Sequence, residues 1–297
     1  RAATTEVQYA ADFLLWFAEE AKRSYGETIP SARADQRFIV SHYPVGVVAA
    51  ITPWNYPVSM ITRKVGPALA AGCTVVLKPA EATPLCAIKV FEILTEAGLP
   101  DGVINLVTTS NPAPVGEEFV SNPLVRKLTF TGSTAVGKML AGKAAGNMKR
   151  VSCELGGHAP FLVFDDADPV HAAKGVQLVK FLNTGQACIS PNRIFVHQSK
   201  VDAFVDTLQS RVANMKAGSG MEDGVTIGPL VDERAVAKVS AQVDDAVAKG
   251  AEVVCGGNRL LSNGLEKGFF YAPTVLRGVT PDMLIYREET FGPVAPI

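Results

Sequence analysis

The sequence predicts an α/β protein in which a parallel sheet, covered by helices on both faces, is followed by a second α/β domain. Two observations predict this fold class. Strand-like runs alternate with helix-like runs along the chain, and the strand-like runs are almost continuously apolar, as in "VGVVAAIT". Strands of parallel sheets are buried on both faces and have this character, and the helices between them supply the crossover connections.

The first series of elements covers the N-terminal half. Strands are expected at 45–52, 73–80, 102–107, 125–132 and 150–155, and helices at 56–72, 83–98 and 133–146. The first of these helices ends in glycine, which is a common helix terminus. Residues 25–44 break the alternation. We expect them to form an extended hairpin that caps the sheet edge or pairs with another subunit.

The pattern starts again after "ELGGHAP". A strand is expected at 161–166, a helix at 168–182, a strand at 193–197, amphipathic helices at 199–215 and 233–250, and a strand at 251–257. We therefore assign 1–24 and 45–156 to a first domain, 25–44 to the hairpin and 157–297 to a second domain. The chain opens without methionine inside a helical pattern, so we expect it to be an excerpt of a longer protein.

The composition narrows the class of protein. The chain has 297 residues, 47% of them hydrophobic, and a net charge of -1. No run of basic residues interleaved with aromatics indicates a nucleic-acid partner, and no apolar stretch has the length of a membrane span. The five cysteines are odd in number and contain no CxxC pair. This argues against a disulfide framework and a metal site, and favours a reducing compartment.

Two segments have the pattern of a nucleotide site. In "FTGSTAVG", Gly132 and Ser133 lie at a strand-to-helix junction, where backbone N–H groups and the positive helix end attract a phosphate. An ordinary capped turn would have the same sequence. Lys78 and Glu81 follow the end of another strand, where open α/β sheets bind ligands, and together they suit the two hydroxyls of a ribose. A solvated loop pair is the alternative.

Asn55 and Glu154 are candidates for polar catalysis. Asn55 lies in "TPWNYP", a stiff loop after the first strong strand, and its amide is a suitable donor to an oxyanion. Asn is equally a favoured turn residue. Glu154 ends an apolar strand and is followed by two glycines, so we expect a buried carboxylate that suits a general base. A structural ion pair is the alternative reading.

Cys188 is the candidate nucleophile. It follows "NTGQA" at the end of a helical pattern, where a glycine-containing turn places backbone N–H groups near the thiol. Such surroundings favour the thiolate, which is the reactive form. The alternative is an inert buried cysteine. The four histidines form no dyad with Cys188, and we interpret them as structural, which argues against a papain-like site.

Six motifs together resemble the aldehyde dehydrogenase superfamily. "TPWNYP", "KPAE", "FTGSTAVG", "ELGG", "GQAC" and "EETFGP" occur in the family's order and at about its spacings, over essentially the whole chain. The resemblance is greatest to the succinate-semialdehyde dehydrogenase branch. It implies a Rossmann-like cofactor domain, a second α/β catalytic domain and an oligomerisation hairpin at 25–44, and hence a homodimer or homotetramer.

The resemblance also implies the role of each residue. Cys188 matches the nucleophile, Glu154 the general base and Asn55 the oxyanion donor. The implied cofactor contacts are Thr52, Trp54, Lys78, Glu81, Gly132, Ser133, Glu289 and Phe291. Arg63 matches an arginine that binds a substrate carboxylate. Since Glu81 would repel a 2′-phosphate on the ribose, we expect NAD to be preferred over NADP.

Three positions depart from the family pattern. Leu182 stands where close semialdehyde relatives have a carboxylate-binding arginine, Ser190 where some have a second cysteine, and His158 where Asn, Lys, Leu or Met is usual. The expected substrate is succinate semialdehyde, with another semialdehyde or an uncharged aliphatic aldehyde as alternatives. An acylating enzyme that uses coenzyme A is disfavoured by Glu154, and a catalytically silent structural member by the intact set of residues. A cytoplasmic location is expected, or the mitochondrial matrix if the source is eukaryotic.

Overall fold

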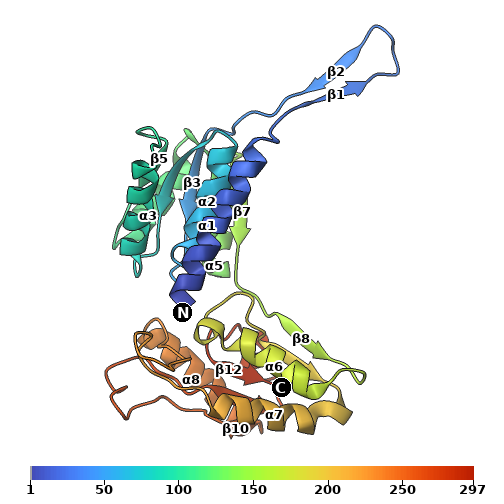
Figure 1. Ribbon diagram of the computed structural model, residues 1–297, viewed down its shortest axis with the longest axis vertical. Coiled ribbons are helices and arrows are strands. Elements are labelled where there is room, and N and C mark those ends of the chain that lie inside the picture. The colour runs from blue at the N-terminus through green and yellow to red at the C-terminus, as the bar shows by residue number, and fades with distance from the viewer. Residues whose placement is uncertain (1) are drawn as a thin grey trace. The chain divides into compact units, whose positions relative to one another are not determined.

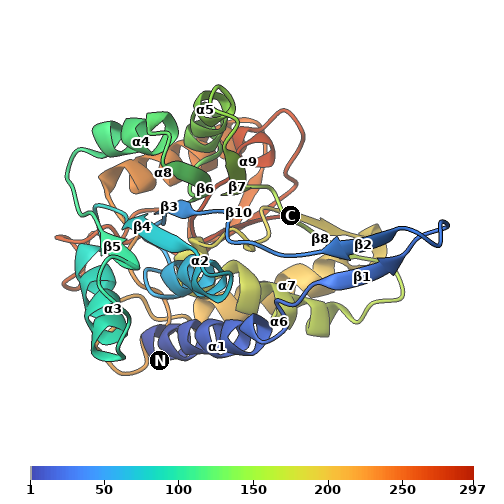
Figure 2. The same cartoon turned by 90° about the horizontal axis from the view of Figure 1, so that it is seen from above.

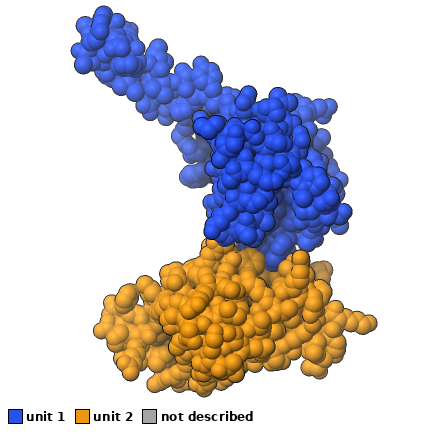
Figure 3. Space-filling view, turned by 180° about the vertical axis from the view of Figure 1, so that it is seen from behind, with its two compact units in different colours: residues 1–155 blue, residues 156–297 orange. Residues whose placement is uncertain are grey.

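The chain folds into two units, Arg1–Leu155 and Gly156–Ile297, which Figure 3 distinguishes by colour. The computed structural model describes residues 2–297. Each unit has apolar cores of its own. Within the described residues, no helix combines the length and the apolar character that a membrane crossing requires.

A five-stranded parallel sheet forms the centre of unit 1, as the sequence predicts (Figure 1). Its strands are β3 (Val47–Ile51), β4 (Thr74–Lys78), β5 (Ile104–Leu106), β6 (Val125–Thr131) and β7 (Arg150–Glu154). Their order in space is β5-β4-β3-β6-β7. The chain therefore runs from the central strand β3 to one edge, returns to the other side of β3, and ends at the opposite edge.

Helices cover both faces of this sheet (Figure 2). Helices α1 (Ala2–Ala21), α2 (Ser59–Ala70) and α3 (Pro84–Glu96) lie on one side, and α4 (Pro112–Ser121) and α5 (Thr134–Ala145) on the other. The central strand shows why both layers are needed. Val48 and Ala50 belong to the core beneath α2 and α3, whereas Ala49 and Ile51 belong to the core beneath α4 and α5. Burial on both faces explains the continuous apolar run in the sequence.

The hairpin expected at 25–44 projects from the rest of unit 1 (Figure 1). It consists of the antiparallel strands β1 (Glu27–Pro30) and β2 (Arg37–Val40), with Glu27 opposite Val40 and Pro30 opposite Arg37. Every residue of both strands is exposed, including Ile29 and Phe38. An isolated two-stranded hairpin is only marginally stable and usually needs packing against other elements. Strands β1 and β2 have no such packing within the described residues.

Unit 2 contains a parallel pair, β8 (Pro160–Val163) and β9 (Arg193–Val196), and a three-stranded sheet in the order β10-β11-β12. The strands of this three-stranded sheet are β10 (Glu252–Cys255), β11 (Thr274–Arg277) and β12 (Val294–Pro296). The helices are α6 (Pro169–Lys180), α7 (Val201–Ala213), α8 (Glu233–Ala248) and the short α9 (Leu284–Arg287). The predictions for this unit contained β8, β9, β10 and the three long helices. They did not contain β11, β12 or α9.

Candidate active site

The candidate residues of unit 1 gather at the carboxyl ends of its parallel strands. Thr52 directly follows β3, Lys78 ends β4, and Gly132 directly follows β6. The Thr52 N–H donates a hydrogen bond to the Lys78 carbonyl oxygen (3.2 Å), which joins two of these strand ends. Because the chain leaves β3 toward one edge and returns beside it as β6, the sheet order reverses between these strands. Open α/β sheets bind ligands at such a reversal.

The turn between β6 and α5 provides a backbone surface at this point. Ser133 caps α5, its Oγ accepting a hydrogen bond from the Val136 N–H (3.4 Å). A Cβ at Gly132 would lie 2.6 Å from the Phe130 ring, and one at Gly137 would lie 2.4 Å from a Leu155 methyl group. The glycines therefore serve close packing at the start of α5. The positive end of this helix and the N–H groups of its first turn suit a phosphate.

Lys78 and Glu81 form an ion pair at the end of β4. The Lys78 ammonium is buried and donates to the Glu81 carboxylate (2.5 Å) and to the Pro79 carbonyl (2.8 Å). Burial alone would raise the pKa of Glu81, but the hydrogen bonds from Lys78 and from the backbone outweigh burial and lower it. Glu81 is therefore ionised at neutral pH. A buried ammonium beside an accessible carboxylate is a suitable donor and acceptor pair for a ribose diol.

The loop between β3 and α2 carries Thr52, Trp54 and Asn55. Thr52 is buried, and its hydroxyl has no hydrogen-bond partner among the described residues. An orphaned buried hydroxyl at a predicted cofactor contact is consistent with a ligand that satisfies it. The loop is held at its far end by Glu6 on α1, whose carboxylate accepts hydrogen bonds from the N–H groups of Val58 (2.8 Å) and Ser59 (3.1 Å).

Glu154 differs from its prediction, because its side chain is exposed and not buried. The physical reason is that side chains alternate along β7: Val151 and Cys153 pack against the core beneath α4 and α5, so Glu154 points to the opposite face, which is exposed at this edge of the sheet. Its backbone is nevertheless tied to the turn between β6 and α5, since the Gly132 N–H donates to the Glu154 carbonyl (3.1 Å). Lys64, a buried neighbour of Glu154, was not among the residues predicted from the sequence. Burial lowers the pKa of Lys64 to about 8, although the charge of Glu154 opposes this shift.

Arg63 packs against helix α1. Its guanidinium lies over the Phe13 ring (4.9 Å to the centroid) and donates a hydrogen bond to the Tyr9 hydroxyl (3.2 Å). Stacking on an aromatic ring holds a guanidinium group flat and leaves its edge for an anion. The structure thus fixes the orientation of Arg63 but contains no carboxylate partner for it among the described residues.

The candidate residues of unit 2 centre on Cys188, which is the exposed cysteine of the five. The loop before it is a left-handed turn, with φ of 50° at Asn183, 60° at Thr184 and 74° at Gly185. Positive φ is normal for glycine but unfavourable for a β-branched residue such as threonine. Strain of this kind persists only where the surroundings impose it, and it is concentrated at functional sites.

Two side chains impose this conformation. The Thr184 hydroxyl donates to the Gly228 carbonyl (3.2 Å) and accepts from the Gly228 N–H (3.0 Å). The Gln186 side-chain amide donates to the Pro229 carbonyl (3.2 Å), and its oxygen accepts from the Val231 N–H (2.9 Å). Both side chains are buried. The loop therefore holds Cys188 at a defined place while leaving its thiol exposed.

The "EETFGP" segment lies against this loop. A Cβ at Gly185 would lie 2.1 Å from the Gly292 carbonyl oxygen, so the two backbones are in direct contact. Phe291 itself has a positive φ of 54°. The carboxylate of Glu289 lies against Gly156, the first residue of unit 2. A Cβ at Gly156 would lie 2.2 Å from the Glu289 Oε2 atom. Unit 2 therefore brings together the predicted nucleophile and both predicted nicotinamide contacts.

Leu182, Ser190 and His158, the three positions that depart from the family pattern, differ in their burial and contacts. Leu182 is 42% exposed, whereas Ser190 is buried and its hydroxyl donates to the Lys180 carbonyl (3.2 Å). His158 is half-buried. Burial, followed by the charges of Arg193, Lys180 and Lys238, lowers its pKa, against a hydrogen bond from the imidazole to the Arg287 backbone, which raises it. His158 is therefore neutral at neutral pH.

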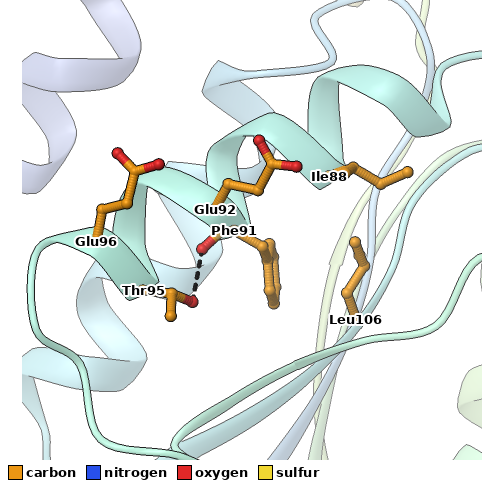
Figure 4. Close-up of a pocket in the computed structure, with 6 residues that line it drawn as sticks. All are labelled: Ile88, Phe91, Glu92, Thr95, Glu96 and Leu106. Atoms are coloured by element: carbon orange, nitrogen blue, oxygen red, sulfur yellow. Dashed lines mark hydrogen bonds between the residues drawn. The ribbon is translucent and has the colours of Figure 1, made fainter.

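A surface hollow of about 450 Å³ lies elsewhere, between α3 and β5 (Figure 4). Its lining includes Ile88, Phe91, Glu92 and Leu106, and Thr95 donates to the Phe91 carbonyl within it (2.9 Å). None of the predicted site residues lines it. It is a shallow edge of the sheet and contributes nothing to the chemistry described above.

The sequence comparisons identify the family. The chain matches the model of the aldehyde dehydrogenase family over residues 1–297 and belongs to that family. It is 54% identical over 292 residues to the NADP(+) succinate-semialdehyde dehydrogenase GabD of Escherichia coli, covering 98% of this chain and 60% of the relative. It is 53% identical to the glutarate-semialdehyde dehydrogenase of Pseudomonas aeruginosa, covering 98% and 59%.

Solved structures show the same fold. An E. coli structure described as an NADP-dependent enzyme superposes with a TM-score of 0.96 at 53% identity, covering 99% of this chain and 60% of that one. The aldehyde dehydrogenase fold expected from the motifs is therefore confirmed. The chain spans about 60% of the length of these relatives.

Proposed function

We propose that this chain is part of an NAD(P)-dependent aldehyde dehydrogenase that oxidises a semialdehyde, with succinate semialdehyde as the first candidate, to the carboxylic acid. The observation that carries the proposal is the presentation of Cys188. An exposed thiol stands on a strained turn that two buried side chains hold in place, against the segment of Glu289 and Phe291. The high identity to two semialdehyde dehydrogenases supports the same class of substrate.

The proposed mechanism assigns one step to each residue. The Cys188 thiolate attacks the aldehyde carbon, and the Asn55 amide and the Cys188 backbone N–H donate hydrogen bonds to the oxygen that becomes negative. NAD(P)+, when bound, supplies the hydride acceptor that converts this adduct to a thioester. Glu154 then takes a proton from water, whose oxygen attacks the thioester carbon. The acid leaves, and the Cys188 thiolate is regenerated.

The cofactor assignment depends on the residues of unit 1. Thr52, Trp54, Lys78, Glu81, Gly132 and Ser133 are proposed to hold the adenosine and phosphate portion, and Glu289 and Phe291 the nicotinamide ribose and ring. The orphaned Thr52 hydroxyl and the paired Lys78 and Glu81 support this fit. We propose a preference for NAD, because the ionised Glu81 would repel a 2′-phosphate. The NADP(+) in the name of the E. coli relative is a reason to test that preference directly.

The proposed substrate carries a carboxylate at its far end. Arg63 is the candidate partner for that carboxylate, since it is the residue of this chain that matches a carboxylate-binding arginine and its guanidinium is already oriented by Phe13. Leu182 supplies no second positive charge, so binding of the carboxylate would depend on one bidentate pair from unit 1. An uncharged aldehyde is therefore the second candidate substrate.

The exposed hairpin supports a proposal about assembly. Strands β1 and β2 are exposed along their whole length and carry Ile29, Phe38 and Ile39 on the surface. We propose that they pair with another copy, giving a homodimer or homotetramer. The five cysteines are all free thiols. They support a location in a reducing compartment such as the cytoplasm.

The test follows NAD reduction by the full-length protein. The kcat/KM values for succinate semialdehyde and for an uncharged aldehyde of similar length are compared, with Cys188→Ala as the negative control. A strong preference for the semialdehyde supports the proposal, and comparable values would indicate a pocket changed by Leu182. Absence of reduction with either aldehyde, together with unaltered assembly in Cys188→Ala, would favour a structural protein instead.

A further inference from the structure

Lys180 is a fully buried lysine that the proposed mechanism does not use. It is the last residue of α6 and is 0% exposed. Among the described residues, its ammonium group has one hydrogen-bond partner, Asn192 Oδ1, at 3.1 Å. Burying a charge without a direct ion pair is expensive, and an apolar residue of similar size would stabilise the fold more. The position therefore calls for an explanation other than stability.

The hydrogen bonds of Lys180 connect it to Glu289, the proposed contact of the nicotinamide ribose. Lys180 donates to the Asn192 side chain, and the Asn192 Nδ2 atom donates to the Gly157 carbonyl oxygen at 3.2 Å. The Gly157 N–H then donates to Glu289 Oε1 at 3.3 Å. Three consecutive hydrogen bonds thus connect a buried ammonium group to the carboxylate of Glu289. The charge of Glu289 in turn favours the protonated form of Lys180.

The same residues close the base of the nucleophile loop, which comprises residues 181–191. Lys180 precedes the loop and Asn192 follows it, so their hydrogen bond ties its two ends together. A second bond, from the Ser190 hydroxyl to the Lys180 carbonyl (3.2 Å), strengthens this closure. Thr184 and Gln186 hold the outer part of the loop to other segments. The base of the loop, in contrast, depends on Lys180 and Asn192.

We propose that Lys180 is a positioning residue: through Asn192 and the backbone of Gly157, it fixes both the Glu289 carboxylate and the base of the loop that carries Cys188. One buried lysine would thereby couple the position of the cofactor ribose to the position of the nucleophile. This inference rests on the proposed function, since it assigns the ribose contact to Glu289 and the nucleophile to Cys188.

The experiment compares Lys180→Met with Lys174→Met in the full-length protein. Lys174 lies on the same helix but is exposed, so it controls for the loss of a lysine from α6. Two readouts are independent of turnover: the Kd for NAD+ and the rate at which iodoacetamide alkylates Cys188. In Lys180→Met the Kd should rise about tenfold, the effect of losing a hydrogen bond to a charged group. The alkylation rate should also change, while Lys174→Met behaves as the wild type.

A second variant guards against misfolding. Asn192→Asp keeps the volume and the acceptor for Lys180 but removes the donor to Gly157, so it interrupts the connection at its second hydrogen bond. It should weaken NAD+ binding in the same direction. In the Glu289→Gln background, the effect of Lys180→Met on the Kd should shrink, because both residues act on one contact.

The outcomes separate the inference from the proposed function. Unchanged Kd and alkylation rate in Lys180→Met and Asn192→Asp would overturn the inference, even if thermal stability changed. A wild-type protein that does not bind NAD+ would contradict the proposed function instead. The alkylation rates would then still decide whether Lys180 positions the Cys188 loop.

Discussion

Gly185 and Gly292 are in backbone contact: a Cβ on Gly185 would lie 2.1 Å from the Gly292 carbonyl oxygen. This contact joins the turn before Cys188 to the segment that carries Glu289 and Phe291. Gly185 also has a φ of 74°, where L-residues are unfavourable. Two independent reasons therefore require glycine at this position, and both concern the placement of the nucleophile.

The variant Gly185→Ala should lose both stability and activity. The left-handed backbone alone costs about 1–2 kcal/mol with a side chain present, and the contact with Gly292 adds to that cost. Urea unfolding measures the loss. Gly228→Ala is the matched control. Its Cβ would lie 3.7 Å from the Thr184 hydroxyl, an ordinary contact, and this variant should remain near wild-type stability. Equal loss in both variants would contradict the explanation.

Local signals were sufficient to predict most of the sheet and helices. The central strand β3 is recognisable because all of its residues are apolar, and Ser133 is recognisable as a helix cap from its place after a glycine turn. The start of α2 has no such signal, since Val58 provides no side-chain cap. Its capping carboxylate comes from Glu6, more than fifty residues earlier in the chain. Contacts of that range leave no pattern in a local stretch.

In the candidate site too, some features could be predicted from the local sequence, whereas others depend on contacts between distant segments. The identity of Cys188 as a candidate followed from "GQAC" in its sequence context, but the left-handed conformation of Thr184 did not. Threonine disfavours that conformation locally, and only the hydrogen bonds to Gly228 impose it. Glu154 was predicted to be buried because its strand looked apolar. Sheet order, which places β7 at an edge, decides its exposure instead. Lys180 lies in the apolar stretch "VQLVKFL", and that contrast was its available signal. Lys64 follows Arg63 and gave no such local signal.

Cys188 should be the fastest-reacting thiol of this chain. It is exposed, whereas Cys73 is buried and the other three cysteines are partly buried. Treatment of the native full-length protein with a thiol reagent should therefore show a fast phase that disappears in Cys188→Ala. The matched control, Cys86→Ala, removes a partly buried thiol from helix α3 and should keep the fast phase. A fast phase that survives in Cys188→Ala would show that the loop protects the thiol.

Glu81→Ser should relax the choice of cofactor. Removing the ionised carboxylate removes its repulsion of a 2′-phosphate, so the ratio of kcat/KM with NADP+ to that with NAD+ should rise on the order of tenfold or more. Glu92→Ser is the control, because Glu92 is also an exposed acid paired with a lysine three residues away. An unchanged ratio in Glu81→Ser would remove the basis for the proposed NAD preference.

Lys180 should give the protein a pH-dependent stability. Burial lowers its pKa to about 7 from the ordinary 10.5, although the charge of Glu289 opposes this shift. Between these values the unfolded chain binds a proton that the folded chain does not, so stability should rise with pH by at most about 1.4 kcal/mol per pH unit. His158 and Glu289 are the titratable groups nearby. Lys180→Met should lack this rise, which urea midpoints at pH 7 and pH 9 would measure.

The pair Gly156→Ala and Gly157→Ala tests whether Glu289 binds the cofactor. A Cβ at Gly156 would lie 2.2 Å from Glu289 Oε2, whereas one at Gly157 meets no described atom within 4 Å. Because the obstructed atom is the end of a flexible side chain, Gly156→Ala should displace the carboxylate with little loss of stability. Its Kd for NAD+ should rise severalfold, about 1 kcal/mol in binding free energy, while Gly157→Ala keeps the wild-type Kd. If the two variants bind NAD+ equally well, Glu289 has no role in holding the ribose.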